Sequence, residues 1–164
     1  VELPEKGDDS RGFGPFVGDQ RSAYFLSVNR GKQSVTIDLR TEAGRDLALD
    51  LAAQVDVLVE NFRPGSMERF GLGYEQVTAR NPRIVYASVS GFGQTGPYAH
   101  RPAYDVIVQA MSGLASITGL PGQPPVRVGS STADLNAALF CVIGIQAALA
   151  RSNQTGLGQH IDVA

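Results

Sequence analysis

Residues 129–150 constrain the fold more than any other stretch of the sequence. The polar segment Gly129–Asn136 (GSSTADLN) is followed by the apolar run Ala137–Ala150. Serine and threonine before an apolar segment are typical of a helix start, because their hydroxyls accept hydrogen bonds from the first free N–H groups. The run leaves almost no polar face, which predicts a helix buried in the core.

Asp134 falls in the first turn of this predicted helix, where the helix dipole favours an anion. The simpler interpretation is an ordinary N-terminal acid that stabilises the helix. The sharper interpretation is a preorganised anionic nucleophile at the mouth of a buried helix. The spacing alone does not decide between them.

The rest of the chain alternates strand and helix patterns. β-Branched and apolar runs predict strands at residues 34–39, 55–60, 83–90 and from 161 onward. Apolar periodicity and start signals predict helices at residues 41–52, 66–70 with Ser66 as its cap, 74–79 and 104–113. The apolar run at 55–60 favours a strand covered on both faces. This order predicts an α/β fold of right-handed βαβ units around a parallel sheet.

Two loops, Asn61–Gly65 and Gly91–Pro97, follow predicted strands and therefore lie at the carboxyl edge of the sheet, where α/β folds bind ligands. The glycine-rich loop from Gly91 matches neither a dinucleotide fingerprint nor a phosphate-binding loop, because no Gly-Lys-Ser/Thr follows. A tight connector is its simpler interpretation.

Charged residues offer two candidate groups. Arg40, Arg63 and Arg69 lie near strand exits, where arginines can clamp phosphates, although a solvated surface fits their spacing equally well. Asp105 and Asp134 each lie near a predicted helix start. Two carboxylates in one pocket can divide acid and base roles, whereas two distant ones are independent helix caps.

Composition excludes several functional classes. Fourteen basic and sixteen acidic residues give a net charge of −2, which does not indicate a nucleic-acid-binding surface. Cys141 is the one cysteine, which excludes an internal disulfide and favours a small core residue in a reducing, cytoplasmic compartment. Two histidines and one cysteine make a structural metal site a poor fit. The helix from Leu135, with Asn136 and Gly144 inside it, is too short for a membrane span.

Six short motifs occur together in this chain. They are Val59–Gly65 (VENFRPG), Arg69–Gly73 (RFGLG), Asn81–Arg83 (NPR), Ser90–Pro97 (SGFGQTGP), Pro102–Asp105 (PAYD) and Gly156–Val163 (GLGQHIDV). In combination they resemble the class III coenzyme A-transferase family, which includes formyl-, carnitine- and succinyl-CoA transferases and 2-methylacyl-CoA racemases.

The resemblance implies roles for individual residues. Asp134 matches the family's nucleophilic aspartate. Pro102 stands where formyl-CoA transferase has a lysine, and either His100 or Arg101 is a candidate substitute for that lysine. The other residues implied to contact coenzyme A are Ile37, Asp38, Leu39 and Arg40 for the adenosine part, Asn61, Phe62, Arg63 and Arg69, and Tyr104 and Asp105 at the thioester end.

The resemblance also implies a Rossmann-like parallel sheet with flanking helices, in the large domain of an interlocked homodimer. We expect residues 1–164 to be part of that CoA-binding domain, without the family's opening strand and helix and without its small C-terminal domain. We therefore do not expect these residues alone to hold a complete active site.

The implied activity is transfer of coenzyme A from an acyl-CoA thioester to a small carboxylic acid through a covalent intermediate on Asp134. Coenzyme A is then a substrate, and no permanently bound cofactor is expected. One rival is a 2-methylacyl-CoA racemase, although the family's racemases carry His-Asp where this chain has Tyr104-Asp105. The other rival is a noncatalytic module that binds CoA or another nucleotide. The sequence does not identify the acyl donor or the acceptor.

Overall fold

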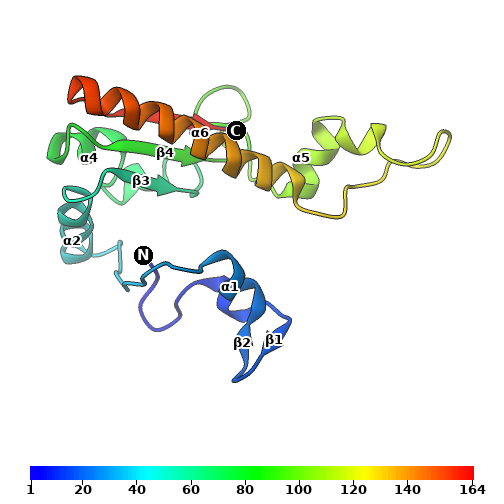
Figure 1. Ribbon diagram of the computed structural model, residues 1–164, viewed down its shortest axis with the longest axis horizontal. Helices are drawn as coiled ribbons and strands as arrows, with labels where there is room; N and C mark the ends of the chain where they lie inside the picture. Colours follow the sequence, from blue (N-terminus) through cyan, green and yellow to red (C-terminus); the bar gives the residue numbers. More distant parts are fainter. The chain divides into compact units, whose positions relative to one another are not determined.

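A parallel sheet organises the larger part of the chain. Strands β3 (Val57–Glu60), β4 (Val85–Val89) and β5 (Gln159–Val163) lie in that order, and both neighbouring pairs are parallel (Figure 1). Helices lie between the strands in the sequence, as the pattern of the chain predicts. The parallel sheet with helices confirms the α/β class.

The computed structural model describes residues 1–164, which form two compact units, unit 1 (Val1–Ala48) and unit 2 (Leu49–Ala164). Unit 1 contains, in chain order, the 3-10 helix η1 (Asp9–Gly12), the antiparallel strands β1 (Phe16–Val17) and β2 (Arg21–Ser22), and helix α1 (Ala23–Val28). Helix α2 (Glu42–Ala52) runs from unit 1 into unit 2. Unit 2 adds α3 (Ser66–Arg69), α4 (Tyr74–Arg80), α5 (Asp105–Met111), η2 (Leu114–Ile117) and α6 (Thr132–Thr155) to the sheet.

Strand β4 forms the centre of the core of unit 2, which confirms the strand predicted at 83–90. The side chains of Ile84, Val85, Tyr86 and Ala87 expose no more than 2% of their surface. The Tyr86 hydroxyl donates a hydrogen bond to the Leu72 carbonyl (3.0 Å). Burial, with a smaller contribution from nearby glutamates, raises the pKa of Tyr86.

Strand β3 is paired on one side only, and its environment differs from the expectation. The run at 55–60 was predicted to be covered on both faces, yet Val59 exposes 58% of its surface. Strand β3 is an edge strand of a three-stranded sheet, so fewer neighbours cover it than cover β4.

The strand predicted at residues 34–39 is wrong. This segment is extended, but it pairs with another segment only through a single parallel bridge between Glu2 and Thr36. The Glu2 N–H donates to the Val35 carbonyl (2.9 Å), and the Ile37 N–H donates to the Glu2 carbonyl (3.0 Å). The chain turns directly after Glu2, where the Gly7 N–H donates to the Leu3 carbonyl (3.0 Å). A strand needs a continuous neighbour, and the turn ends the ladder after one residue.

Ser66 does not cap helix α3 as predicted. The N-cap position is held by Gly65, whose φ of 81° lies in the left-handed region that favours glycine. Ser66 is the first residue of the helix, and its hydroxyl instead accepts a hydrogen bond from the Arg69 guanidinium (2.8 Å).

Helix α6 packs along β4 and β5 but is not the buried helix that its sequence predicts (Figure 1). Its buried residues are Cys141, Ala148 and Ser152, and the Ser152 hydroxyl donates to the Arg83 carbonyl (3.0 Å). Burial confirms Cys141 as a core residue and raises the pKa of its thiol. One side of α6 covers the sheet, whereas Leu135, Leu139, Val142 and Ile143 on the other side each expose more than half of their surface.

The sequence also underestimated the length of α6. The helix continues to Thr155, and its 24 residues include an 18-residue window with a mean hydropathy of 1.7. By length and composition alone, such a helix can cross a membrane. Core helices of soluble proteins pass the same test, and α6 contacts two strands of the sheet.

Two glycines make the turn from α6 into β5 possible. Gly156 ends α6 with a φ of 76°, in the left-handed region. A Cβ on Gly158 would lie 1.8 Å from the Ile84 carbonyl oxygen, so only glycine allows this close approach to the segment before β4. The Gly158 N–H donates to the Pro82 carbonyl (2.8 Å), which aligns the start of β5 with β4.

We expect residues 1–164, produced alone, to self-associate through the exposed face of α6, because large apolar patches are unfavourable in water. Light scattering should give a mass above the 17.4 kDa of one chain. Replacing Leu139 and Ile143 with glutamate should shift the population toward the monomer. A stable monomer of the unchanged chain at working concentration would contradict this expectation.

Candidate active site

The N-terminus of α6 is capped by a residue from another helix. The predicted hydroxyl caps are absent, because the Ser130 and Thr132 hydroxyls bond to each other (3.0 Å) and Ser131 makes no side-chain cap. Instead, Asp105 Oδ1 accepts hydrogen bonds from the Ala133 N–H (2.8 Å) and, more weakly, from the Asp134 N–H (3.5 Å). A carboxylate on free N–H groups at a helix start is favoured by the dipole as well as by hydrogen bonding.

Gln109 completes this cap from the same side of α5. Its Nε2 donates to Asp105 Oδ2 (2.6 Å) and to the Ser130 carbonyl (3.2 Å), and its Oε1 accepts from the Val128 N–H (2.8 Å). The residue is fully buried. The sequence pattern does not single out Gln109, although its position four residues after Asp105 on a helix is a usable signal.

Asp134 and Asp105 are therefore neighbours, a point that the sequence left open. The Asp134 side chain is exposed, whereas Asp105 is buried. Partial burial and then the negative charge of Asp105 raise the pKa of Asp134. We expected the helix N-terminus to stabilise the Asp134 anion, which would lower its pKa, and the observed direction is the opposite. The free N–H groups at this helix start are bonded to Asp105 instead.

The loop after β3 places several predicted CoA contacts near the carboxyl edge of the sheet. The Asn61 side chain donates to the Val89 carbonyl (2.6 Å), which links the ends of β3 and β4. The Phe62 N–H donates to the buried Glu60 carboxylate (2.8 Å). The Phe62 ring is exposed and meets the Phe70 ring edge-on, with centroids 5.8 Å apart. The loop is thus held by its polar groups while an aromatic face stays open to solvent.

Arg63 and Arg69 flank the turn into α3, and both side chains are exposed. Arg69 is anchored to Ser66, as described above. The proposed three-arginine clamp remains a prediction, because Arg40 belongs to unit 1, where its guanidinium forms two hydrogen bonds to Asp38 (2.8 and 2.9 Å). These bonds lower the pKa of Asp38. The neighbouring Ile37 is buried, and Leu39 is partly exposed.

Arg101 and Tyr104 lie on the segment that leads into α5. The Arg101 guanidinium lies over the Tyr98 ring, 4.2 Å from its centroid. Tyr104 is the N-cap residue of α5, and its side chain exposes 81% of its surface. Tyr104 is therefore adjacent in sequence to the buried Asp105 but open to a ligand.

The glycine-rich loop is fixed to the end of the sheet. The Gln94 N–H donates to Asp162 Oδ2 (2.9 Å), and the Ser90 N–H donates to the Val163 carbonyl (3.0 Å). A Cβ on Gly91 would meet the Ala103 Cβ at 2.1 Å. The Ser90 hydroxyl and the Gln94 side-chain nitrogen are buried without a hydrogen-bond partner. The loop is thus a tight connector that carries two buried polar groups without partners.

His160 contacts Ser88 across the sheet, with Nε2 and Oγ 2.9 Å apart. The imidazole also stacks on Tyr74, with centroids 5.2 Å apart. Ser88 exposes 1% of its surface, so its hydroxyl cannot reach a substrate. The pair is therefore a packing contact inside unit 2. No group of three His, Cys, Asp or Glu side chains is placed to hold a metal ion.

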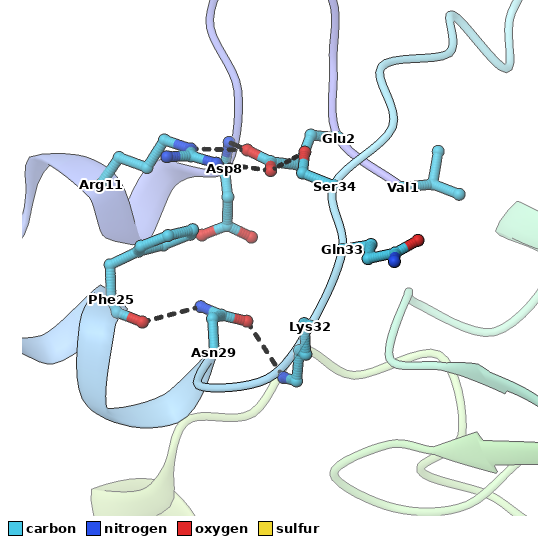
Figure 2. A pocket seen from close by; sticks show the side chains of 9 residues that line it. All are labelled: Val1, Glu2, Asp8, Arg11, Phe25, Asn29, Lys32, Gln33 and Ser34. Atoms are coloured by element: carbon cyan, nitrogen blue, oxygen red, sulfur yellow. Dashed lines mark hydrogen bonds and ion pairs between the residues drawn. The ribbon is translucent and has the colours of Figure 1, made fainter.

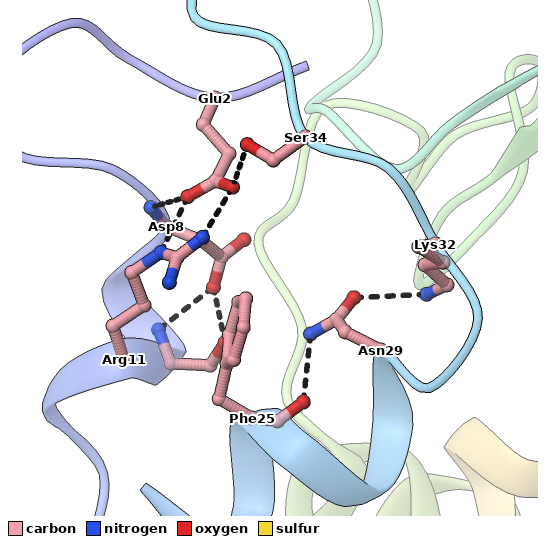
Figure 3. A network of polar contacts seen from close by, with 8 residues as sticks. Glu2, Asp8, Arg11, Phe25, Asn29, Lys32 and Ser34 are labelled. Carbon is pink, nitrogen blue, oxygen red and sulfur yellow. Dashed lines mark hydrogen bonds and ion pairs between the residues drawn. The ribbon is translucent and has the colours of Figure 1, made fainter. Parts of the chain in front are cut away.

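Unit 1 has a separate cavity of about 280 Å³. Figure 2 shows its lining, which consists of Val1, Glu2, Asp8, Arg11, Phe25, Asn29, Lys32, Gln33 and Ser34. The Glu2 carboxylate accepts hydrogen bonds from the Arg11 guanidinium (both 2.7 Å), the Asp8 N–H (2.8 Å) and the Ser34 hydroxyl (Figure 3). These bonds, with the Arg11 contact as the largest cause, lower the pKa of Glu2. Glu2 thus joins Asp8, Arg11 and Ser34, and Lys32 donates to Asn29 (3.0 Å). None of the predicted site residues lines this cavity.

Comparison with known proteins gives consistent results. Residues 1–164 match the sequence profile of CoA-transferase family III. Acetyl-CoA:oxalate CoA-transferase from Acetobacter aceti is 54% identical over 100% of this chain and 42% of its own length. Human succinyl-CoA:glutarate CoA-transferase is 44% identical over 99% of this chain and 37% of its own length. The chain thus spans about two fifths of the length of these relatives.

Solved structures agree with the sequence comparison. The crystal structure of a CAIB/BAIF family protein from Brucella suis is 48% identical, with a TM-score of 0.93 over 99% of this chain and 44% of that one. A hypothetical protein from Mycobacterium tuberculosis is 34% identical, with a TM-score of 0.89 over 99% of this chain and 45% of that one. The backbone described above is therefore that of a family of known structure.

We expect Asp134→Asn to raise the thermal stability of the protein at neutral pH. A carboxyl group whose pKa is raised by folding destabilises the fold once it is ionised, so removing the charge should add about 1–3 °C to Tm, after allowance for solvent screening. The gain should shrink as the pH falls toward 3.8, the ordinary pKa of an aspartate. Asp50→Asn, which breaks a surface ion pair with Arg80, serves as a control and should give no gain. A pH-independent effect of Asp134→Asn would contradict the charge argument.

Proposed function

Because the chain belongs to CoA-transferase family III, we propose that the complete protein transfers coenzyme A from an acyl-CoA thioester to a carboxylic acid. The match of the family profile to residues 1–164 is the observation that carries this proposal. Coenzyme A is a substrate in this reaction, and no permanently bound cofactor is required.

We further propose that the acceptor is a dicarboxylic acid. The relatives' names mention oxalate, glutarate, malate and citramalate, which all carry two carboxylates. The exposed Arg101 is a suitable partner for a second carboxylate. Turnover of acetyl-CoA or succinyl-CoA with oxalate and glutarate, compared with acetate, tests this preference.

Asp134 is the proposed nucleophile. Its carboxylate oxygen attacks the thioester carbonyl, the C–S bond breaks, and a mixed anhydride and CoA thiolate form. The thiolate attacks the aspartyl carbonyl, which gives an aspartyl-CoA thioester and releases the donor carboxylate. The acceptor carboxylate then attacks this thioester and releases the thiolate, which attacks the acceptor carbonyl of the new anhydride. The products are acceptor-CoA and free Asp134.

The geometry at the start of α6 supports this assignment. Asp134 is exposed, so it is open to a substrate, and its raised pKa makes the carboxylate more basic and thus more nucleophilic. Asp105 is buried and bonded to three N–H groups, so it is not free to attack. We therefore assign Asp105 a structural and electrostatic role beside the nucleophile.

A transferase fits these residues better than a racemase. Racemisation needs a base on each face of the substrate with a pKa near the working pH. The residue before Asp105 is Tyr104. An ordinary phenol has a pKa of about 10, whereas an ordinary imidazole has a pKa of about 6.5. The relatives described above are also named as transferases.

We also propose a homodimer and a cytoplasmic location for the complete protein. The exposed apolar face of α6 is consistent with a second protomer that covers it. One buried cysteine is consistent with a reducing compartment.

Asp134→Ala in the complete protein should abolish turnover and leave CoA affinity nearly unchanged, because the side chain acts in bond making. Incubation of the wild type with an acyl-CoA, followed by trapping with hydroxylamine and peptide mapping, should place the modification on Asp134. A label on another residue, or near wild-type turnover by Asp134→Ala, would remove the assignment. Deuterium uptake at the 2-carbon of a 2-methylacyl-CoA without CoA transfer would indicate the racemase instead.

Arg63→Ala or Arg69→Ala should weaken CoA binding. Loss of a charge-assisted bond to phosphate typically costs about 1.5–3 kcal/mol, roughly a ten- to hundredfold change in Kd. Isothermal calorimetry on the complete protein measures this change. Arg80→Ala is the matched control, because Arg80 pairs with Asp50 at the surface and should not affect Kd. Unchanged affinity in both test variants would remove the arginines from the CoA site.

A further inference from the structure

Gln109 is an unusual residue for the core of unit 2. Its side chain exposes none of its surface, and a buried amide is costly unless its hydrogen bonds are made. Both donors of Nε2 and the acceptor Oε1 are used, toward Asp105, Ser130 and Val128. These partners determine the orientation of the amide, because exchanging its oxygen and nitrogen would place an acceptor against the Asp105 carboxylate.

We propose that Gln109 is a positioning residue for Asp134, which it holds through Asp105 and through the turn before α6. This inference rests on the proposed function, in which Asp134 attacks the thioester. Gln109 lies one turn after Asp105 on α5 and does not itself need to contact the substrate.

The first connection runs through the Asp105 carboxylate. Gln109 bonds to Oδ2 (2.6 Å), and Oδ1 accepts the N–H groups of Ala133 (2.8 Å) and Asp134 (3.5 Å). The carboxylate is thus held at both oxygens, by a side chain from α5 and by the backbone of α6. A rotation of the Asp105 side chain would release the residue that carries the reacting group.

The second connection runs through the turn that precedes α6. Gln109 binds the N–H of Val128 and the carbonyl of Ser130, so it holds the backbone on both sides of Gly129. Ser131 follows as the N-cap, and its carbonyl accepts the Leu135 N–H (2.9 Å), which closes the first turn. Asp134 lies in that turn, so both connections determine its backbone position.

Positioning has a large effect on a reaction of this kind. A displacement of about 1 Å at a reacting group can cost roughly a hundredfold in rate. Gln109 also affects the electrostatics of the site, because its Nε2 orients the Asp105 carboxyl group beside Asp134. Partial burial is the largest cause of the raised pKa of Asp134, and the charge of Asp105 is the second. Loss of Gln109 would therefore disturb both the place and the basicity of the nucleophile.

Two variants of Gln109 in the complete protein test this proposal. Gln109→Met keeps a similar volume and removes all three hydrogen bonds. Gln109→Glu keeps the shape and an acceptor for the Val128 N–H, but when ionised it places a second carboxylate against Asp105. Both should lower kcat about 10–100-fold at neutral pH, with KM for the acyl-CoA changed less than about threefold.

The pH dependence separates positioning from general stability. A protonated glutamate can donate an O–H to Asp105 in place of the amide N–H. The kcat of Gln109→Glu, relative to the wild type, should therefore rise as the pH falls, whereas that of Gln109→Met should stay low at every pH. If Gln109→Met fails to fold, the pH dependence of Gln109→Glu still decides the question.

Ser152→Ala is the matched control. Ser152 is another buried polar residue, at the far end of α6, and its hydroxyl bonds to the Arg83 carbonyl. Its loss should lower Tm without changing the pH profile of kcat. Wild-type kcat in both Gln109 variants, or a Gln109→Glu to wild-type kcat ratio that is constant with pH, would overturn the proposal.

The same experiment distinguishes this inference from the proposed function. Hydroxylamine trapping of the wild type should label Asp134, and both Gln109 variants should label the same residue more slowly. Wild-type labelling of Asp134 with unaffected Gln109 variants would overturn the positioning role alone. A wild type that shows no label on Asp134 would overturn the nucleophile and the inference with it.

Discussion

The hydrogen bonds between the Asp105 carboxylate and the start of α6 join two helices that are far apart in sequence. They occupy N–H groups that a helix leaves without partners at its first turn, and they bring a negative charge to Asp134. A helix start normally lowers the energy of a nearby carboxylate anion. Here the free N–H groups are bonded to Asp105, and Asp134 is left with a raised pKa and an exposed side chain.

The parallel sheet positions the loops of unit 2 that carry several of the predicted CoA contacts. Its carboxyl edge carries the loop from Asn61 and the glycine-rich loop from Gly91, and side-chain bonds from Asn61 and Asp162 hold these loops to neighbouring strands. Gly158 makes the approach of β5 to the segment before β4 possible, and thereby the placement of Asp162. These side-chain bonds and the close approach at Gly158 hold the edge of the sheet together.

Helix α6 shows how hydrophobicity and burial can differ. A side chain is buried only where another element covers it, and the sheet has three strands, which cover one face of the helix. Cys141, Ala148 and Ser152 are small enough to bring the helix close to the strands, while the larger apolar side chains face away. An apolar pattern on every side of a helix therefore indicates that several surfaces can pack on it, without showing which of them does so.

The sequence by itself determined the α/β class, strands β4 and β5, helices α4 and α5, and the position of Asp134 in the first turn of a long apolar helix. These features depend on local patterns, namely side-chain periodicity and residues that begin or end helices. Only the tertiary structure decided that Asp105 caps α6, that Gln109 holds this cap, and that residues 34–39 do not form a strand. A cap 28 residues away and a ladder that ends after one residue depend on which segments meet in space. Side-chain periodicity carries no information about such long-range contacts.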